Sequence, residues 1–153
     1  MKSRSILKGR QRGVTMLELL IVVAIIAIIS SFAYPSYMRY VVSTKRTAAT
    51  SALLQIADRQ QQFFMDNKAY TADLTDLGFA ANPYVIADDG TAAAAGDSDA
   101  TYSISLSNVA ATTYTITAAP LQGQLKRDTY CGSMILNQAG NRSSSGGGDD
   151  CWR

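Results

Sequence analysis

The sequence lacks histidine, and among its 153 residues it has only two cysteines and three prolines. The absence of histidine disfavours a His-ligated metal site and a catalytic triad that uses imidazole as its base. The two cysteines, Cys131 and Cys151, do not form a CxxC redox motif, and no P-loop or Gly-x-Gly-x-x-Gly motif follows an expected strand. We therefore expect neither an enzyme nor a bound cofactor or metal.

Acidic residues are absent from the first 13 positions, which carry five of the 14 Lys and Arg residues. This asymmetry places the N-terminus in the cytoplasm by the positive-inside rule. Without residues 1–13 the chain keeps 9 basic and 12 acidic residues, which gives a net charge of −3. Charge alone therefore does not predict a nucleic-acid binder. The basic residues of this leader are Lys2, Arg4, Lys8, Arg10 and Arg12.

A long apolar run extends from Val14 to Ala33 and carries one charge, Glu18. A span needs about 20 mostly apolar residues to cross the hydrocarbon, so this length predicts a membrane helix rather than a buried strand. A carboxylate inside a span is costly and is expected to have a partner. A cut after Gly13 would create an α-amino group on Val14, and the ammonium of a neighbouring chain could then neutralise Glu18.

The run RGVTMLELLIVVAIIAII, residues 12–29, closely resembles the class III signal of type IV prepilins. The resemblance implies that an inner-membrane prepilin peptidase cuts after Gly13 and methylates Val14, where the family usually has phenylalanine. It implies that Glu18 guides docking into a helical filament of pilin subunits. It also implies an assembly platform and an ATPase as further partners.

Other interpretations of the N-terminus stay open. A basic segment, an apolar core and the small-residue site Ser31-Phe32-Ala33 also fit an ordinary secretory signal. A cut there would release a soluble domain beginning at Tyr34. A type II secretion pseudopilin shares the prepilin signal, and an exposed or tip pilin that binds DNA or a surface is a further alternative.

The helical pattern continues from residue 35 to residue 66, and we expect Pro35 to kink the helix without ending it. No Gly or Pro occurs from Tyr37 to Met65. Apolar residues recur at helical spacing and predict a face that packs on a sheet. These residues are Ala49, Ala52, Leu53, Ile56, Phe63 and Phe64.

Residues 67–101 read as a loop that contains one short helical turn, with Thr71 as its N-cap and Gly78 as its C-cap. Residues 84–86 are expected to form a short edge strand. The aspartates of this loop do not have the spacing of an EF-hand, so we interpret them as solvated rather than as a calcium site. They are Asp88, Asp89, Asp97 and Asp99.

Residues 102–153 predict an antiparallel sheet of three or four strands and a tail closed by the cysteines. Apolar and polar residues alternate over 102–107 and 113–117, and a third strand is expected over 131–137. Residues 122–124 and 127–128 look like turns. An even number of cysteines in an exported domain predicts one disulfide, Cys131–Cys151, around the segment SSSGGGDD. We expect Trp152 to cover the sheet edge.

The tail pattern Tyr-Cys-Gly, Leu-Asn-Gln-x-Gly and Cys-Trp resembles the C-terminal region of PilE-type minor pilins and related pilins. The whole chain is thus predicted to be an α+β type IV pilin. Its leader is residues 1–13, its assembly helix 14–34, and its periplasmic part the remainder. We expect an inner-membrane prepilin that becomes a minor subunit of the extracellular pilus and supports pilus assembly, twitching motility, adhesion or DNA uptake. A basic patch for DNA would consist of Lys126, Arg127, Arg142 and Arg153.

Overall fold

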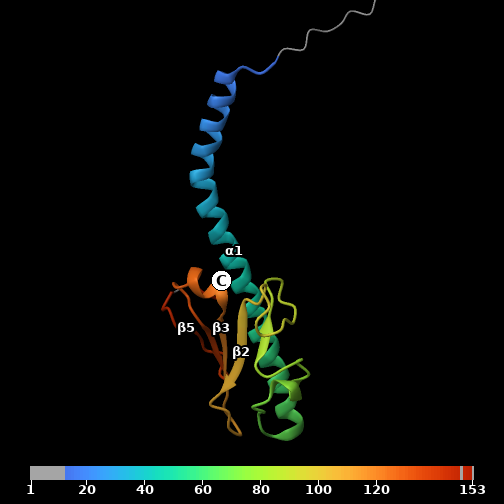
Figure 1. The fold of residues 1–153 in the computed structure, drawn as a ribbon. Helices are drawn as coiled ribbons and strands as arrows, with labels where there is room; N and C mark the ends of the chain where they lie inside the picture. Colours follow the sequence, from blue (N-terminus) through green and yellow to red (C-terminus); the bar gives the residue numbers. More distant parts are fainter. Residues whose placement is uncertain (1–12, 149, 153) are drawn as a thin grey trace, which may run out of the picture. The chain divides into compact units, whose positions relative to one another are not determined.

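The computed structural model describes residues 13–148 and 150–152. Residues 1–12 of the predicted leader, and Arg153 of the predicted basic patch, lie outside the described residues. The chain divides into two compact units, Met1–Met38 and Arg39–Arg153, and each is described by itself. Figure 1 shows the helices and strands in chain order. They are α1 (Met16–Asn67), the 3₁₀ helix η1 (Leu74–Leu77), β1 (Tyr84–Ile86), β2 (Tyr102–Ser107), β3 (Thr115–Pro120), α2 (Gln122–Arg127), β4 (Met134–Asn137) and β5 (Arg142–Ser144).

The first unit consists of the N-terminal part of α1. Thr15 caps this helix, since its Oγ1 accepts a hydrogen bond of 3.2 Å from the backbone N–H of Glu18. The apolar window of α1 is long enough to cross a membrane, and none of it is buried within the protein. A helix with large apolar side chains on all sides needs lipid or other helices around it. Pro35 lies inside α1, and a kink at this residue stays a prediction.

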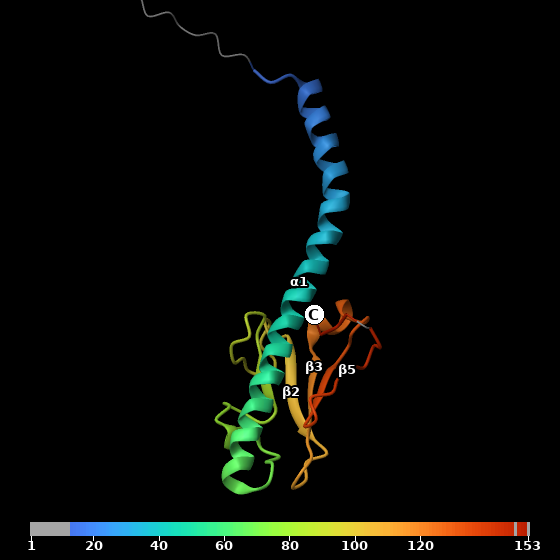
Figure 2. The ribbon, with the colours of Figure 1, turned by 180° about the vertical axis from the view of Figure 1, so that it is seen from behind.

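In the second unit, the C-terminal part of α1 packs on one face of the sheet (Figures 1 and 2). The predicted apolar face is confirmed, because Ala49, Leu53 and Ile56 are fully buried and Ala52 nearly so. Phe63 packs at the edge of this core. Phe64 instead stacks on the ring of Tyr70, with 4.8 Å between the centroids.

The sheet is an antiparallel meander in the order β1-β2-β3-β4-β5. Tyr102 pairs with Pro120, and Ile116 pairs with both Leu106 and Leu136. The side chains that alternate toward α1 are the buried ones, and the others lie on the more exposed face. The α+β arrangement predicted from alternation is thus confirmed. The residues buried under α1 are Tyr102, Ile104, Ile116, Ala118, Met134 and Leu136.

Several predicted element bounds are wrong. The sheet has five strands rather than three or four, because residues 142–144 pair with β4 as a further strand. The second main strand is Thr115–Pro120 rather than 113–117, and the third begins at Met134 rather than at Cys131. These errors arise because small or polar residues enter strands through backbone pairing, which side-chain alternation does not reveal.

Two short helices were also misplaced. Residues 122–127 form α2, although they look like turns in the sequence. The N-cap of η1 is Asp73 rather than Thr71, whereas the predicted C-cap, Gly78, is correct and has φ +80°. Thr71 instead accepts a hydrogen bond from the N–H of Asp73 and donates one to Asp76.

Candidate functional site

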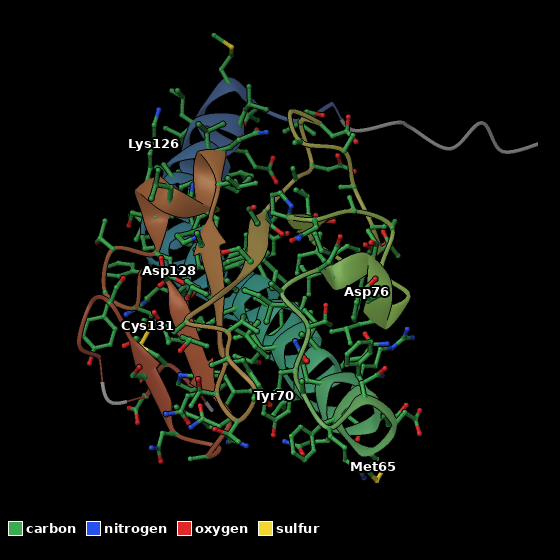
Figure 3. The ribbon with its side chains drawn as sticks, turned by 90° about the horizontal axis from the view of Figure 1, so that it is seen from below. Met65, Tyr70, Asp76, Lys126, Asp128 and Cys131 are labelled. Atoms are coloured by element: carbon green, nitrogen blue, oxygen red, sulfur yellow. A yellow bond between two sulfur atoms is a disulfide. The ribbon has the colours of Figure 1, made fainter. Side chains whose placement is uncertain are left out.

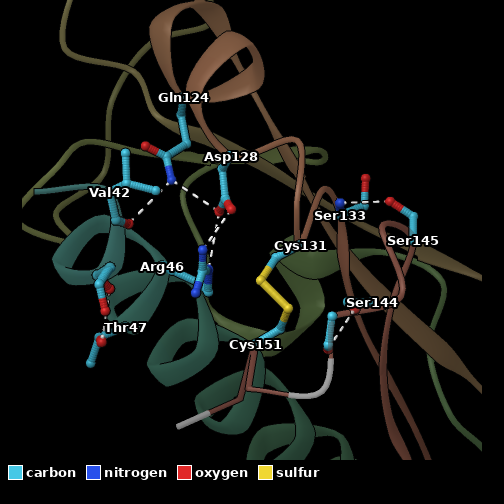
Figure 4. A network of polar contacts seen from close by, with 12 residues as sticks. Val42, Arg46, Thr47, Gln124, Asp128, Cys131, Ser133, Ser144, Ser145 and Cys151 are labelled. Atoms are coloured by element: carbon cyan, nitrogen blue, oxygen red, sulfur yellow. Dashed lines mark hydrogen bonds and ion pairs between the residues drawn. A yellow bond between two sulfur atoms is a disulfide. The ribbon is translucent and has the colours of Figure 1, made fainter. Parts of the chain in front are cut away.

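A buried polar network joins α1 and α2 (Figure 4), and Tyr102 of β2 belongs to it as well. Asp128, at the C-cap of α2, is 1% exposed. Arg46 of α1 donates to both of its carboxylate oxygens, with Nη2–Oδ1 at 2.6 Å and Nε–Oδ2 at 3.1 Å. A bidentate guanidinium–carboxylate pair combines charge with a defined planar geometry. The pair therefore sets where the chain leaves α2.

Tyr102 and Gln124 complete this network. The Tyr102 hydroxyl donates to Asp128 Oδ2 at 3.1 Å, and Gln124 Nε2 donates to the Tyr102 hydroxyl at 2.9 Å. Gln124 Nε2 also lies 3.3 Å from the carbonyl oxygen of Val42, and so connects α2 to α1. Burial raises the pKa of the Tyr102 hydroxyl far above its ordinary value, and the nearby Asp128 carboxylate raises it further. Tyr102 therefore stays protonated, and able to donate to Asp128, above the pH at which an exposed tyrosine ionises.

The Cys131–Cys151 disulfide closes the tail, as predicted for the fold. Cys131, the first cysteine of this bond, follows the buried network closely in the chain. The N–H of the next residue, Gly132, donates to the Asp128 carbonyl at 2.8 Å. Inside the loop, the N–H of Ser133 donates to Ser145 Oγ at 2.8 Å. A Cβ at Gly148 would overlap the ring of Tyr130 and the sulfur of Cys151, so a larger residue here would force one of these side chains to shift. The serine and glycine run is thus a largely exposed loop that is held at a few points by hydrogen bonds and by the disulfide.

The closed tail carries two aromatic side chains and a cation that reach solvent; we call Tyr130, Arg142 and Trp152 together the tail face. Trp152 Nε1 donates to the Ser143 carbonyl at 2.9 Å, so the ring covers β5, as expected. The Arg142 guanidinium lies 5.5 Å from the centre of that ring. Tyr130 is exposed beside Gly148. Cations over rings and exposed aromatics can bind phosphates and stack on bases.

The predicted basic patch is divided between two places. Lys126 and Arg127 lie in the last turn of α2, beyond the end of β3 at Pro120. Arg142 lies on β5, two strands away from β3. It is in register with Leu136 of β4, which in turn is in register with Ile116 of β3. Ile116 lies four residues before Pro120. At about 3.3 Å per residue, this separates the two places by roughly 13 Å along the strand direction alone. The predicted patch is therefore two surfaces.

The loop aspartates serve local backbone structure. Asp89 Oδ1 accepts from the hydroxyl and the N–H of Thr91, and these hydrogen bonds lower the pKa of its carboxyl group. Asp97 Oδ2 accepts from the N–H of Ala94 at 2.8 Å. Asp88 lies 4.0 Å from Lys45 Nζ, both being partly exposed. Among residues 13–148 and 150–152, no three acidic or cysteine side chains gather as a metal site would require.

Sequence reasoning missed the buried network. Asp128 and Arg46 are 82 positions apart, and neither belongs to a recognisable motif. Their only signal is the four-residue spacing of Gln124 and Asp128, which places both on one side of α2. The expected roles of Gly13, Val14 and Glu18 stay predictions. In the structure, Glu18 lies in the first turn of α1.

Together, a long apolar helix, a five-stranded antiparallel sheet on its second half and a disulfide-closed tail define the type IV pilin fold. Residues 35–135 match the family described as "Type IV minor pilin ComP, DNA uptake sequence receptor", and residues 8–34 match the "Prokaryotic N-terminal methylation motif". The chain belongs to this family of type IV minor pilins.

Curated relatives are also type IV pilins. The chain is 35% identical over 71 residues to the "Type IV major pilin protein PilA" of Myxococcus xanthus, covering 46% of this chain and 32% of that protein. It is 33% identical over 75 residues to a "Fimbrial protein" of Pseudomonas aeruginosa, covering 45% and 49%. It is 41% identical over 59 residues to the "Type IV major fimbrial protein FimA" of Dichelobacter nodosus, covering 36% and 37%. The chain thus spans between a third and a half of the length of these relatives.

Proposed function

We propose that this pilin is a minor subunit of a type IV pilus and binds DNA during its uptake. The observation that carries the proposal is the match of residues 35–135 to the minor-pilin family of DNA uptake receptors. The N-terminal motif match over residues 8–34 supports entry into the pilus pathway. The exposed apolar helix supplies the surface that subunits need in order to pack together.

The pathway begins with a prepilin anchored in the inner membrane, with a cytoplasmic N-terminus. The prepilin peptidase removes residues 1–13 and methylates Val14. The assembly platform and its ATPase then move α1 from lipid into the filament, where neighbouring helices replace the acyl chains. Glu18 pairs there with the N-terminal ammonium of another subunit, in surroundings where an unpaired charge is costly.

Removal of the leader leaves a net charge of −3, so the chain as a whole does not attract DNA. Contact with DNA must therefore come from a local group of cationic and aromatic side chains. The tail face fits the task, since it combines the Arg142 guanidinium with the Trp152 ring and with exposed Tyr130. Arginine provides attraction to phosphate, and the rings provide stacking surfaces. We therefore place the DNA contact at the tail face.

Binding of fluorescent DNA to the mature, detergent-solubilised chain tests this proposal. We expect binding that weakens as salt rises, and that Arg142→Gln weakens it about threefold to tenfold while flattening the salt dependence by about one phosphate contact. Lys68→Gln is the matched control, since Lys68 donates to a backbone carbonyl at the end of α1. Equal binding by wild type and Arg142→Gln would exclude the tail face as the site of DNA contact. No binding by wild type would reject DNA binding as a function of this chain.

A second candidate is the major pilus subunit, because the relatives above include major pilins. The two roles differ in abundance. Quantitative mass spectrometry of sheared filaments distinguishes them: a minor pilin contributes a small fraction of the subunits, whereas a major pilin dominates.

A further inference from the structure

Helix α2 lies at the end of the second unit where α1 enters it (Figure 1). Its residue Gln124 reaches the carbonyl oxygen of Val42 at 3.3 Å. Val42 comes only three positions after Arg39, with which the second unit begins. The opposite end of this part of α1 carries Met65, and Figure 3 shows Lys126 and Met65 on opposite sides. Helix α2 thus contacts the beginning of the part of α1 that belongs to the second unit.

The outer side of α2 is amphipathic. Leu125 is 57% exposed, although it is a large apolar side chain in a short helix. Lys126 and Arg127 follow it and are exposed as well. Neither cation forms an ion pair with a carboxylate in the part of the chain that the structure describes. An exposed leucine beside unpaired cations is the pattern of surfaces that lie in a membrane interface.

The membrane boundary lies close to this position along the chain. Exposed tyrosines occur at positions 34, 37 and 40 of α1, and tyrosine is enriched where the hydrocarbon meets the headgroups. Val42 follows Tyr37 by five residues, which is about 8 Å of helix at 1.5 Å per residue. The headgroup layer on each side of a bilayer is about 5–8 Å thick. Val42, which Gln124 of α2 contacts, is therefore separated from Tyr37 along the chain by about the thickness of one headgroup layer.

The charges around α2 favour an anionic surface. Lys45 is compensated in part by Asp88 at 4.0 Å. Asp99 and Arg127 line a common cavity of about 150 Å³, so one carboxylate opposes the cations here. The two exposed cations Lys126 and Arg127 outnumber this carboxylate.

We propose that α2 is a membrane-docking element of the waiting prepilin, and that its partner is an anionic phospholipid bilayer. Lys126 and Arg127 contact lipid phosphates, and Leu125 enters the boundary between headgroups and acyl chains. The contact holds the second unit on the periplasmic surface of the membrane until extraction of α1 releases it. This inference requires membrane anchoring through α1, but it does not require DNA binding.

Depth-dependent quenching of tryptophan by brominated lipids tests the proposal in the full chain reconstituted into vesicles. The sequence has a single tryptophan, so Trp152→Phe gives a silent background. Leu125→Trp then reports on α2. Met65→Trp is the matched control, because Met65 is 63% exposed at the far end of α1. Phe32→Trp, in the apolar run, reports membrane insertion of α1.

We expect quenching of Leu125→Trp about twofold above that of Met65→Trp in vesicles with about 30% phosphatidylglycerol, and less in pure phosphatidylcholine. Adding Lys126→Gln and Arg127→Gln should reduce it to the control level. Quenched Phe32→Trp together with unquenched Leu125→Trp overturns the docking proposal alone. Unquenched Phe32→Trp overturns membrane anchoring and, with it, the docking. Unchanged quenching after Lys126→Gln and Arg127→Gln, with weaker DNA binding, assigns these cations to nucleic acid and also overturns the proposal.

Discussion

Arg46 and Asp128 form a bidentate ion pair across 82 positions of the chain, with their closest atoms 2.6 Å apart. The Asp128 side chain is 1% exposed and that of Arg46 is 16% exposed. This pair connects the long helix to the start of the cysteine-closed tail. It is the polar link on which the position of the tail depends.

Removing one member of this pair should destabilise the second unit strongly. We expect Asp128→Ala to lower the free energy of unfolding by about 3–5 kcal/mol, because it leaves a largely buried guanidinium without its partner. Denaturant unfolding followed by circular dichroism measures this. Lys45→Gln is the matched control on the same helix, and its partly exposed pair should cost no more than about 1 kcal/mol. Equal losses in both variants would show that the buried pair has no special role.

Removal of the disulfide should loosen the tail more than the rest of the sheet. We expect Cys131→Ser with Cys151→Ser to cost roughly 3 kcal/mol, since the bond closes a loop of 20 residues. Trp152 fluorescence should shift to the red, because its ring leaves β5. Arg46→Met is an informative comparison, as it should destabilise the fold without opening the loop. An unshifted Trp152 spectrum in the double serine variant would mean that β5 holds the tail without the bond.

Tyr102 should make stability sensitive to alkaline pH. Tyrosine in the unfolded chain ionises near pH 10, whereas burial keeps Tyr102 protonated because its pKa is raised. Above pH 10 the unfolded state therefore binds fewer protons than the native state, so this stabilisation is complete below pH 10 and falls as the pH rises further. We expect Tyr102→Phe to cost about 1–2 kcal/mol at pH 7 through lost hydrogen bonds.

The difference between wild type and Tyr102→Phe should then narrow above pH 10, as measured by denaturant unfolding from pH 7 to pH 11. A difference that stays constant over this range would show that Tyr102 does not carry the alkaline sensitivity. Tyr84→Phe, at the partly exposed edge strand β1, is a suitable control.

Glu18 should be needed for assembly and dispensable for processing. We expect Glu18→Ala to be cleaved normally but to appear in filaments at about a tenth of the wild-type level or less, because the N-terminal ammonium loses its partner in a medium of low dielectric constant. Ser30→Ala, on the same exposed helix, should assemble normally. Immunoblots of cells and of sheared filaments separate the two steps, and normal assembly of Glu18→Ala would rule out the pairing role.

Gly13 should be needed for leader removal. A bulky residue, as in Gly13→Phe, is expected to leave uncut precursor in the membrane. The mass of the N-terminal peptide measures this, since the cut wild-type chain begins at Val14 with the added mass of a methyl group. A chain that begins at Tyr34 would indicate an ordinary secretory signal. Normal processing of Gly13→Phe would move the cleavage site elsewhere.

Long-range periodicity carried most of what could be predicted about the fold. The length of the apolar run predicted the assembly helix, and the recurrence of apolar residues over several later turns predicted the face of α1 that covers the sheet. Alternation likewise identified β2 and the core of β4. The bounds of β3 and the existence of β5 were not visible, because Ala118, Ala119 and Ser143 carry little pattern of their own and pair only through a neighbouring backbone.

The sites divide in the same way. The sequence alone was enough to identify the prepilin signal, the single charge Glu18 within the apolar run and the two cysteines. Each of these depends on residues close together in the sequence or on a simple count of residues. Tertiary structure alone decided that Asp128 is buried against Arg46, that α2 faces outward at the entry of α1, and that the basic residues form two surfaces. These depend on contacts between distant segments, and their free energy comes from desolvation and geometry that exist only after the chain has folded.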